Sequence, residues 1–198
     1  MSLVLPAAGL VVAAVPSVAT APEALVGRWQ ARAPERRLVL VPARPRGVGD
    51  LPLGDQLAAE RVRLRSVERG DALALAPELR TLLLRPWREL GRVERYLAGV
   101  VRARLGGADV VVLDQPGSAL PALRLRTLIS ALGADGVGVV WLERRLRLPA
   151  ALGLATWLID REIERGPVES HTLLDDEAAW TLCFGGGLDP APPEPPPA

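Results

Sequence analysis

Short runs of apolar, mostly β-branched residues recur along the chain and are separated by longer amphipathic stretches. The runs occupy residues 9–15, 38–41, 110–113, 137–141 and 156–159. Glycine, proline or charged residues bound these runs, as expected for strands that are buried on both faces of a parallel sheet. The pattern therefore predicts a mostly parallel β-sheet whose strands alternate with helices.

The longest stretch without a strand signal predicts a helical region at residues 50–105. It is rich in Leu, Ala, Arg and Glu, which favour helices. In its last part, Val93, Leu97 and Val101 fall on one helical face, while charged residues fall elsewhere. The pair Gly106-Gly107 then ends this helix before the next strand begins.

The size and charge of the chain fit one folded domain that does not bind nucleic acid. The chain has 198 residues and a net charge of +1, with arginines and acids interspersed. We expect the domain to span residues 1–187, and the Pro-rich residues 188–198 to form a disordered tail. The single Cys183 excludes an internal disulfide, and with the lone His171 it predicts no zinc site.

The apolar segment at residues 3–21 raises the alternative of an exported protein. Ala19-Thr20-Ala21 resembles a signal-peptidase site. Against export, no positive residue precedes the apolar run, and Pro6 and Gly9 interrupt it. No stretch of 18 uninterrupted apolar residues occurs, so we expect no transmembrane helix. An exported binding or structural protein therefore follows only if this segment is a signal peptide.

The apolar strand at residues 110–113 ends in Asp114, a position that suits a magnesium-binding carboxylate. Yet the chain contains no lysine, and all 24 of its basic residues are arginine. A phosphate-binding loop of the type G-x-x-x-x-G-K-[ST] needs glycines for close approach, a lysine for the phosphates and a hydroxyl for magnesium. No segment supplies that set, so we predict that the chemistry of a nucleotide hydrolase is missing.

Three ordered motifs around this strand carry a resemblance to a known family. They read Leu-Gly-Arg-Val-Glu-Arg-Tyr-Leu at 90–97, Val-Arg-Ala at 101–103, and Val-Leu-Asp-Gln-Pro-Gly-Ser-Ala-Leu-Pro at 112–121. They resemble the L-S-G-G-E-R-Q-R signature, the A-R-A turn and the L-L-D-E-P-T-S-A-L-D strand of the ATP-binding cassette (ABC) ATPases of membrane transporters. The spacing from Leu90 to Asp114 matches that family without a gap.

The resemblance implies the P-loop NTPase fold, an α/β fold with a mostly parallel sheet flanked by helices and a helical subdomain at about residues 50–105. It extends roughly from residue 9 to residue 166. Residues 37–45 resemble a strand and Q-loop, with Ala43 at the position of the glutamine. Between residues 27 and 38 the chain is shorter than the family, which predicts that part of the peripheral antiparallel sheet is missing.

The resemblance also places a degenerate phosphate loop at residues 15–25. The nucleotide-binding positions that remain there are Ser17, Thr20, Ala21 and Pro22, with Ala21 at the position of the lysine. Side chains replace the loop glycines, and Pro22 lacks a backbone N–H. Affinity for a triphosphate should therefore be very low.

The catalytic positions implied by the resemblance are degenerate as well. Gln115 takes the place of the catalytic glutamate, and Glu143 or Arg144 takes the place of the switch histidine. Gln115 cannot act as a general base, because an amide has no proton affinity to use at neutral pH. Asp114 remains the candidate magnesium ligand, and bracing of the adjoining loop is its alternative role.

The signature-like segment comprises Leu90, Gly91, Arg92, Val93 and Glu94. In the family, cassettes pair so that each signature covers the nucleotide of the other. Backbone N–H groups at this helix start could therefore bind the γ-phosphate of a partner's nucleotide. Arg92 is either a phosphate contact in trans or a solvated arginine at a helix start.

These observations lead to the hypothesis of a pseudo-ATPase subunit of an ABC transporter, without a catalytic residue or a cofactor of its own. It would pair with an active ABC ATPase subunit as a heterodimer, with a membrane permease, or with itself, through residues 90–94 and 117–121. We expect it in the cytoplasm, at the inner face of the cell membrane. The alternative is an ATPase subunit that contributes to hydrolysis only in a composite site, where the partner's phosphate loop brings ATP and magnesium. The transported substrate stays open.

Overall fold

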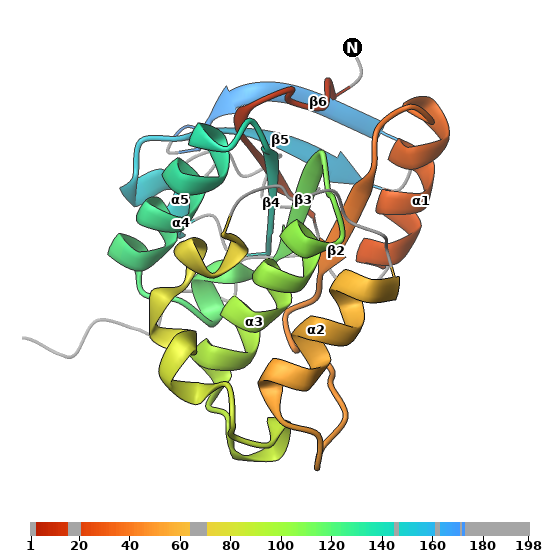
Figure 1. The fold of residues 1–198 in the computed structure, drawn as a ribbon. Helices are drawn as coiled ribbons and strands as arrows, with labels where there is room; N and C mark the ends of the chain where they lie inside the picture. The colour runs from red at the N-terminus through yellow and green to blue at the C-terminus, as the bar shows by residue number, and fades with distance from the viewer. Residues whose placement is uncertain are drawn as a thin grey trace, which may run out of the picture.

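The computed structural model describes residues 3–15, 21–63, 71–144, 147–160, 163–170 and 172, which form an α/β fold (Figure 1). A six-stranded sheet with the order β2-β3-β4-β1-β5-β6 lies at its centre. The strands are β1 (Gly9–Ala14), β2 (Leu38–Val41), β3 (Val110–Asp114), β4 (Gly138–Glu143), β5 (Ala155–Asp160) and β6 (Ile163–Glu169). The first five are parallel, and β6 runs antiparallel to β5.

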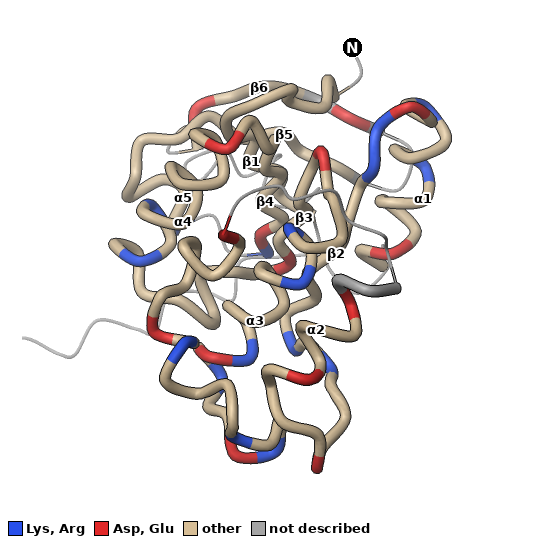
Figure 2. The backbone as a smooth tube through the Cα atoms, viewed as in Figure 1, with Lys and Arg blue, Asp and Glu red and all other residues tan. Residues whose placement is uncertain are grey.

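The apolar runs of the sequence correspond to the parallel strands. All five predicted strands are present. Every residue of β3 and β4 is buried, as expected for strands covered on both faces. No apolar run marks β6, because Glu164, Arg165 and the pair Gly166-Pro167 interrupt it. Figure 2 shows acidic residues near both ends of this strand.

Helices cover both faces of the sheet. They are α1 (Pro22–Arg32), α2 (Leu53–Arg63), α3 (Arg92–Leu105), α4 (Ala122–Ala134) and α5 (Arg147–Ala151), with 3-10 helices η1 (Ala72–Leu75), η2 (Pro77–Leu82), η3 (Trp87–Glu89) and η4 (Pro116–Ser118). The described residues between 50 and 105 contain no strand, apart from one isolated bridge between Pro52 and Pro86. None of the described helices is long and apolar enough to cross a membrane.

The predicted amphipathic helix is α3, and a glycine turn ends it as expected. Gly107 adopts φ 73°, a left-handed conformation that glycine reaches without steric cost. The direct connection from α1 to β2 through residues 33–37 accounts for the short segment between residues 27 and 38. The predicted tail at residues 188–198 lies outside the described residues.

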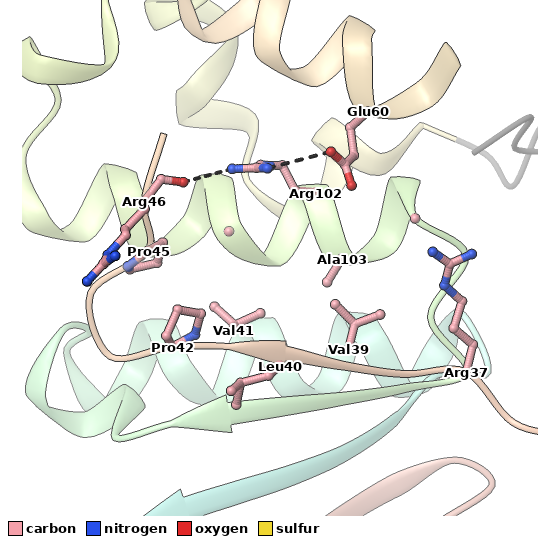
Figure 3. Close-up of a pocket in the computed structure, with 12 residues that line it drawn as sticks. Arg37, Val39, Leu40, Val41, Pro42, Pro45, Arg46, Glu60, Arg102 and Ala103 are labelled. Carbon is pink, nitrogen blue, oxygen red and sulfur yellow. Dashed lines mark hydrogen bonds and ion pairs between the residues drawn. The ribbon is translucent and has the colours of Figure 1, made fainter. Parts of the chain in front are cut away.

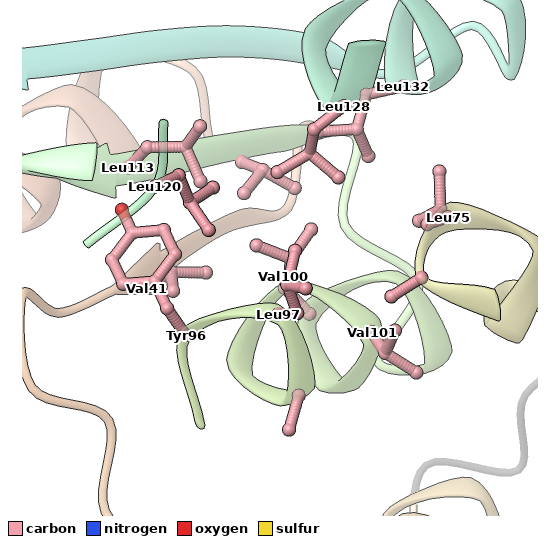
Figure 4. Packing of buried hydrophobic residues seen from close by; sticks show 14 of the residues in the cluster. Val41, Leu75, Tyr96, Leu97, Val100, Val101, Leu113, Leu120, Leu128 and Leu132 are labelled. Carbon is pink, nitrogen blue, oxygen red and sulfur yellow. The ribbon is translucent and has the colours of Figure 1, made fainter. Parts of the chain in front are cut away.

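The hydrophobic core lies on both faces of the sheet. Neighbouring residues of β3 point to opposite faces, so Val111 and Val112 belong to different clusters. Figure 4 shows side chains of α3 and α4, among them Leu97 and Leu128, in the cluster of the first face. On the second face, α1 contributes the fully buried Trp29. Each such large side chain contributes about 1.5–3 kcal/mol when it is buried.

A buried carboxylate joins the N-terminal segment, α1 and β6. The Glu164 side chain is only 3% exposed. It accepts hydrogen bonds from Leu3 N–H at 2.7 Å, Trp29 Nε1 at 3.1 Å and the Arg32 guanidinium at 2.8 Å. Burial acts to raise the pKa of Glu164, but these hydrogen bonds and the charge of Arg32 lower it below its ordinary value. The charged form of Glu164 therefore stabilises the fold.

Replacing Glu164 by Gln should lower the free energy of unfolding at pH 7 by about 1–3 kcal/mol, because an amide carries no charge and accepts fewer of the hydrogen bonds. Urea denaturation measures this loss. A lowered pKa in the fold means that the contribution of Glu164 is present above its unfolded pKa and is lost as the pH falls through its folded pKa. The difference between wild type and E164Q should therefore shrink in acid.

The control for this measurement is Glu169→Gln, which alters an exposed carboxylate of the same strand. It should unfold like the wild type at every pH. A stability loss in E164Q that stays constant down to acid pH would show that the charge of Glu164 does not stabilise the fold.

Candidate functional site

The carboxyl ends of β1, β3 and β4 meet the start of α1 at one edge of the sheet, where open α/β folds bind their ligands. The cavity at this edge has a volume of only about 10 Å³. Its lining residues are Val15, Pro22, Asp114, Leu142, Glu143 and Arg144. The cavity holds about one water-sized probe.

The structure brings several predicted site residues together at this cavity. Pro22, Asp114, Glu143 and Arg144 all line it, while Ser17 and Thr20 lie outside the described residues. Ala21 immediately precedes α1 in an extended conformation and makes no side-chain cap for the helix. The carbonyl of Ala21 accepts the N–H groups of residues 24 and 25, so the first turn of α1 is closed by its own backbone.

Asp114 is buried, with 9% of its surface exposed, and it braces the loop that follows β2. Its Oδ2 accepts the Ala43 N–H at 3.1 Å, and its Oδ1 accepts a long contact of 3.5 Å from Gln115 Nε2. This contact fits the bracing role. Among the described residues, no group of three or more His, Cys, Asp or Glu side chains gathers to hold a metal ion.

Gln115 has a left-handed backbone, with φ 46° and ψ 50°, which a side chain other than glycine rarely adopts. Such a conformation costs about 1–3 kcal/mol and persists only where neighbouring contacts impose it. Its N–H donates to the Leu142 carbonyl at 2.8 Å, and its carbonyl accepts the Ser118 N–H at 3.0 Å. These bonds fix the sharp turn from β3 into η4. No local signal in the sequence indicated this turn.

Glu143 places a second buried carboxylate beside Asp114. Its Oε2 accepts Trp141 Nε1 at 3.1 Å, and its Oε1 accepts the Arg144 N–H at 2.9 Å. A Cβ atom at Gly117 would lie 3.2 Å from Oε2, so the loop after β3 approaches this carboxylate closely. The predicted switch position therefore holds an acid that is already hydrogen-bonded inside the fold.

Tyr96 joins α3 to the end of β3, a contact that sequence reasoning missed. Its hydroxyl is buried and donates to the Asp114 carbonyl at 3.2 Å. Burial first, and then the negative charges of Asp114 and Glu143, raise the pKa of Tyr96 well above its ordinary value of 10.0. The only hint in the sequence is an aromatic residue among the charged positions at the start of the predicted helix.

The signature-like segment begins α3, and its first N–H group is already occupied. Leu90 is buried, whereas Gly91 and Arg92 are exposed. The Gly91 N–H donates to the carboxylate of Glu94 in the first turn of α3. An anion from a partner would have to displace this internal carboxylate to bind the Gly91 N–H. The backbone N–H groups of Arg92 and Val93, in the first turn of α3, have no acceptor within the helix.

Arg92 connects this segment to the loop at residues 117–121. Its guanidinium donates to Ser118 Oγ at 2.8 Å, and Ser118 Oγ donates to the Gln115 carbonyl at 2.7 Å. The two segments predicted to face a partner therefore lie side by side. Within the loop, Ala119 and Leu120 are buried, with 7% and 3% of their surface exposed. The expectation that these two residues face a partner is wrong, because the chain folds them into the core after η4.

Comparison with solved structures decides the fold. An ABC transporter described as metal-chelate type, in an inward-facing conformation, aligns with a TM-score of 0.61 and 16% identity over 90% of this chain and 79% of that chain. An ATP-binding cassette of an ABC transporter in its ADP conformation aligns with a TM-score of 0.64 and 12% identity over 89% of this chain and 87% of that chain. The chain has the fold of an ATP-binding cassette.

The same fold occurs in other settings among the matching structures. An archaeal ribosome recycling factor, solved with a ribosomal stalk protein, aligns with a TM-score of 0.62 and 15% identity, and the match covers 87% of this chain and 40% of that chain. No protein-family model matches the sequence, and a search of curated proteins finds no match. The α/β cassette fold expected from the sequence is confirmed.

Tyr96 is the only tyrosine of the chain, so its ionisation can be followed alone. An alkaline absorbance titration should show no tyrosinate near pH 10 until the protein unfolds. Because the pKa of Tyr96 is raised in the fold, its contribution to stability is complete below its unfolded pKa and is lost as the pH rises beyond it.

The Tyr96→Phe variant provides the control for this titration. It should lack the tyrosinate signal, and it should lose about 1 kcal/mol of unfolding free energy because the Asp114 carbonyl loses its donor. A reversible tyrosinate signal near pH 10 from wild-type protein with native circular dichroism would contradict the burial of Tyr96.

Proposed function

We propose that this chain is a subunit of the ATP-binding-cassette type that neither binds nor hydrolyses ATP by itself. It acts by pairing with an active ATPase subunit, with a membrane permease, or with both. The acidic cavity at the sheet edge carries this proposal. Asp114 and Glu143 are buried where an anionic triphosphate needs positive partners, and the chain has no lysine. Two carboxylates and one arginine, Arg144, line this cavity, so without a bound cation the carboxylates would repel a phosphate.

The positions that would activate water also argue against hydrolysis by this chain alone. Gln115 cannot accept a proton at neutral pH. The carboxylate of Glu143 is already engaged by Trp141 and by the backbone of Arg144. A general base must instead be free to contact the attacking water. These contacts therefore support a structural role for the side chains of Gln115 and Glu143.

The purified chain should not bind ATP with magnesium at physiological concentrations. Isothermal titration calorimetry should give no saturable heat below about 1 mM ligand, which corresponds to roughly −4 kcal/mol of binding free energy. A titration with magnesium alone separates metal binding at Asp114 from nucleotide binding. A one-to-one complex with ATP that is tighter than about 1 mM would overturn the proposal.

The composite-site alternative predicts a different experimental result. It would be supported if phosphate release appeared only after mixing with an active cassette and disappeared in the Arg92→Glu variant. The internal bond between the Gly91 N–H and Glu94 would compete with a partner's phosphate for one donor at this helix start.

A pairing surface at the first turns of α3 and α4 supports a role in association. We define it as Arg92, Val93, Ser118 and Leu123, of which Val93 is 39% and Leu123 is 78% exposed. Exposed apolar side chains beside a positioned arginine are typical of protein interfaces. Within this proposal the subunit lies at the inner face of the cell membrane and takes its membrane contact from a permease.

Charge reversal by Arg92→Glu should weaken pairing about tenfold without unfolding the chain, because Arg92 is exposed and lies within the pairing surface. Multi-angle light scattering of the purified chain measures self-association, and tagged protein from the native cells measures recovery of an identified cassette or permease.

Arg28→Glu is the matched control for pairing, because α1 packs on the opposite face of the sheet. It should pair like the wild type. The subunit proposal fails if wild-type protein is monomeric and recovers neither a cassette nor a permease, or if Arg92→Glu and Arg28→Glu pair equally well.

A further inference from the structure

A groove of about 290 Å³ follows the outer edge of the sheet, between β2 and α3 (Figure 3). Val39 and Val41 of β2 and Ala103 of α3 form its apolar wall. Arg37 stands at one end and Arg46 at the other, as Figure 3 shows. The groove shares none of its lining residues with the cavity at Asp114.

The backbone of β2 is open along this groove. β2 is the first strand in the sheet order and pairs only with β3 among the described residues. The Arg37 carbonyl accepts the Asp109 and Val110 N–H groups, so residue 37 points its backbone toward β3. Successive residues of a strand alternate in direction, which turns the backbone groups of Leu38 and Leu40 toward the open edge.

The open edge has a limited set of hydrogen-bonding groups. The side chain of Gln30 already accepts the Leu38 N–H at 3.0 Å. Pro42, the next residue that faces outward, has no N–H. The Leu40 N–H and the carbonyls of Leu38 and Leu40 are therefore the groups that a further strand could use. They span about 7 Å, two residues at roughly 3.3 Å per residue.

The charge around the groove favours an acidic ligand. Arg102 is paired with Glu60 at 3.5 Å and donates to the Arg46 carbonyl at 2.9 Å. Within the part of the chain that the structure describes, no acceptor contacts the guanidinium groups of Arg37 and Arg46. The lining carries three arginines and one glutamate. The Asp109 carboxylate accepts the Arg37 N–H at 2.8 Å beside one end, so the groove keeps a net positive charge that is strongest at Arg46.

We propose that β2 binds an extended segment of a partner protein, apolar in its centre and acidic at both ends, which adds to the sheet as an outer strand. The Leu40 backbone pairs with the segment, Val39 contacts its apolar side chains, and Arg37 and Arg46 bind its acidic ends. A second copy of this chain does not fit, because two β2 edges would bring like charges together. The site is independent of nucleotide and of the pairing surface.

The test uses a fluorescein-labelled, end-blocked pentapeptide of sequence Glu-Val-Ile-Val-Glu and the full chain. Fluorescence anisotropy should give saturable binding below about 1 mM. The double variant Arg37→Glu with Arg46→Glu should bind about tenfold more weakly, whereas Arg28→Glu should bind like the wild type. A peptide with Lys at both ends should not bind. Thermal unfolding checks that each variant remains folded.

Backbone pairing has its own signature, which charge attraction alone would not produce. Hydrogen exchange of the Leu40 amide should slow at least about tenfold at saturating peptide. A peptide with N-methylated isoleucine, which lacks one amide donor, should bind more weakly. The proposal is overturned if the pentapeptide does not bind, if the double variant binds like the wild type, or if binding leaves the Leu40 exchange rate unchanged.

Discussion

The hydrogen bonds of Asp114 tie together the elements around the cavity. Its carboxylate accepts the Ala43 N–H and fixes the loop after β2, while its carbonyl accepts the Tyr96 hydroxyl and fixes α3 against the sheet. The bond from Tyr96 is buried and the bond from Ala43 is partly buried. The loss of either partner would leave a polar group of Asp114 unsatisfied at this edge of the sheet. Asp114 is thus a structural junction at the position that the resemblance assigns to a magnesium ligand.

The protein's own carboxylates occupy backbone donors at several predicted nucleotide positions. Glu94 takes the Gly91 N–H, Glu143 takes the Arg144 N–H, and Asp114 takes the Ala43 N–H. Each bond satisfies a backbone donor within the chain itself. These internal bonds stabilise the edge of the sheet and the start of α3.

Local sequence pattern was sufficient for the parallel strands and for α3, because burial on both faces imposes long apolar runs and burial on one face imposes helical spacing. It was insufficient for β6, whose Glu164 is held by residues more than 130 positions away in the chain. The local sequence pattern also did not predict the left-handed turn at Gln115 or the inward position of Ala119. Both depend on how the loop after β3 packs against β4 and α5, which no local pattern encodes.

The bonds from Arg92 through Ser118 to Gln115 have a mechanical consequence. They form a continuous link from the exposed start of α3 to the strained turn at the end of β3. A partner that displaces this helix start must either break the link or pull the turn with it. Two hydrogen bonds therefore couple the surface at the start of α3 to the central sheet. Any displacement of this helix start would reach the end of β3 through them.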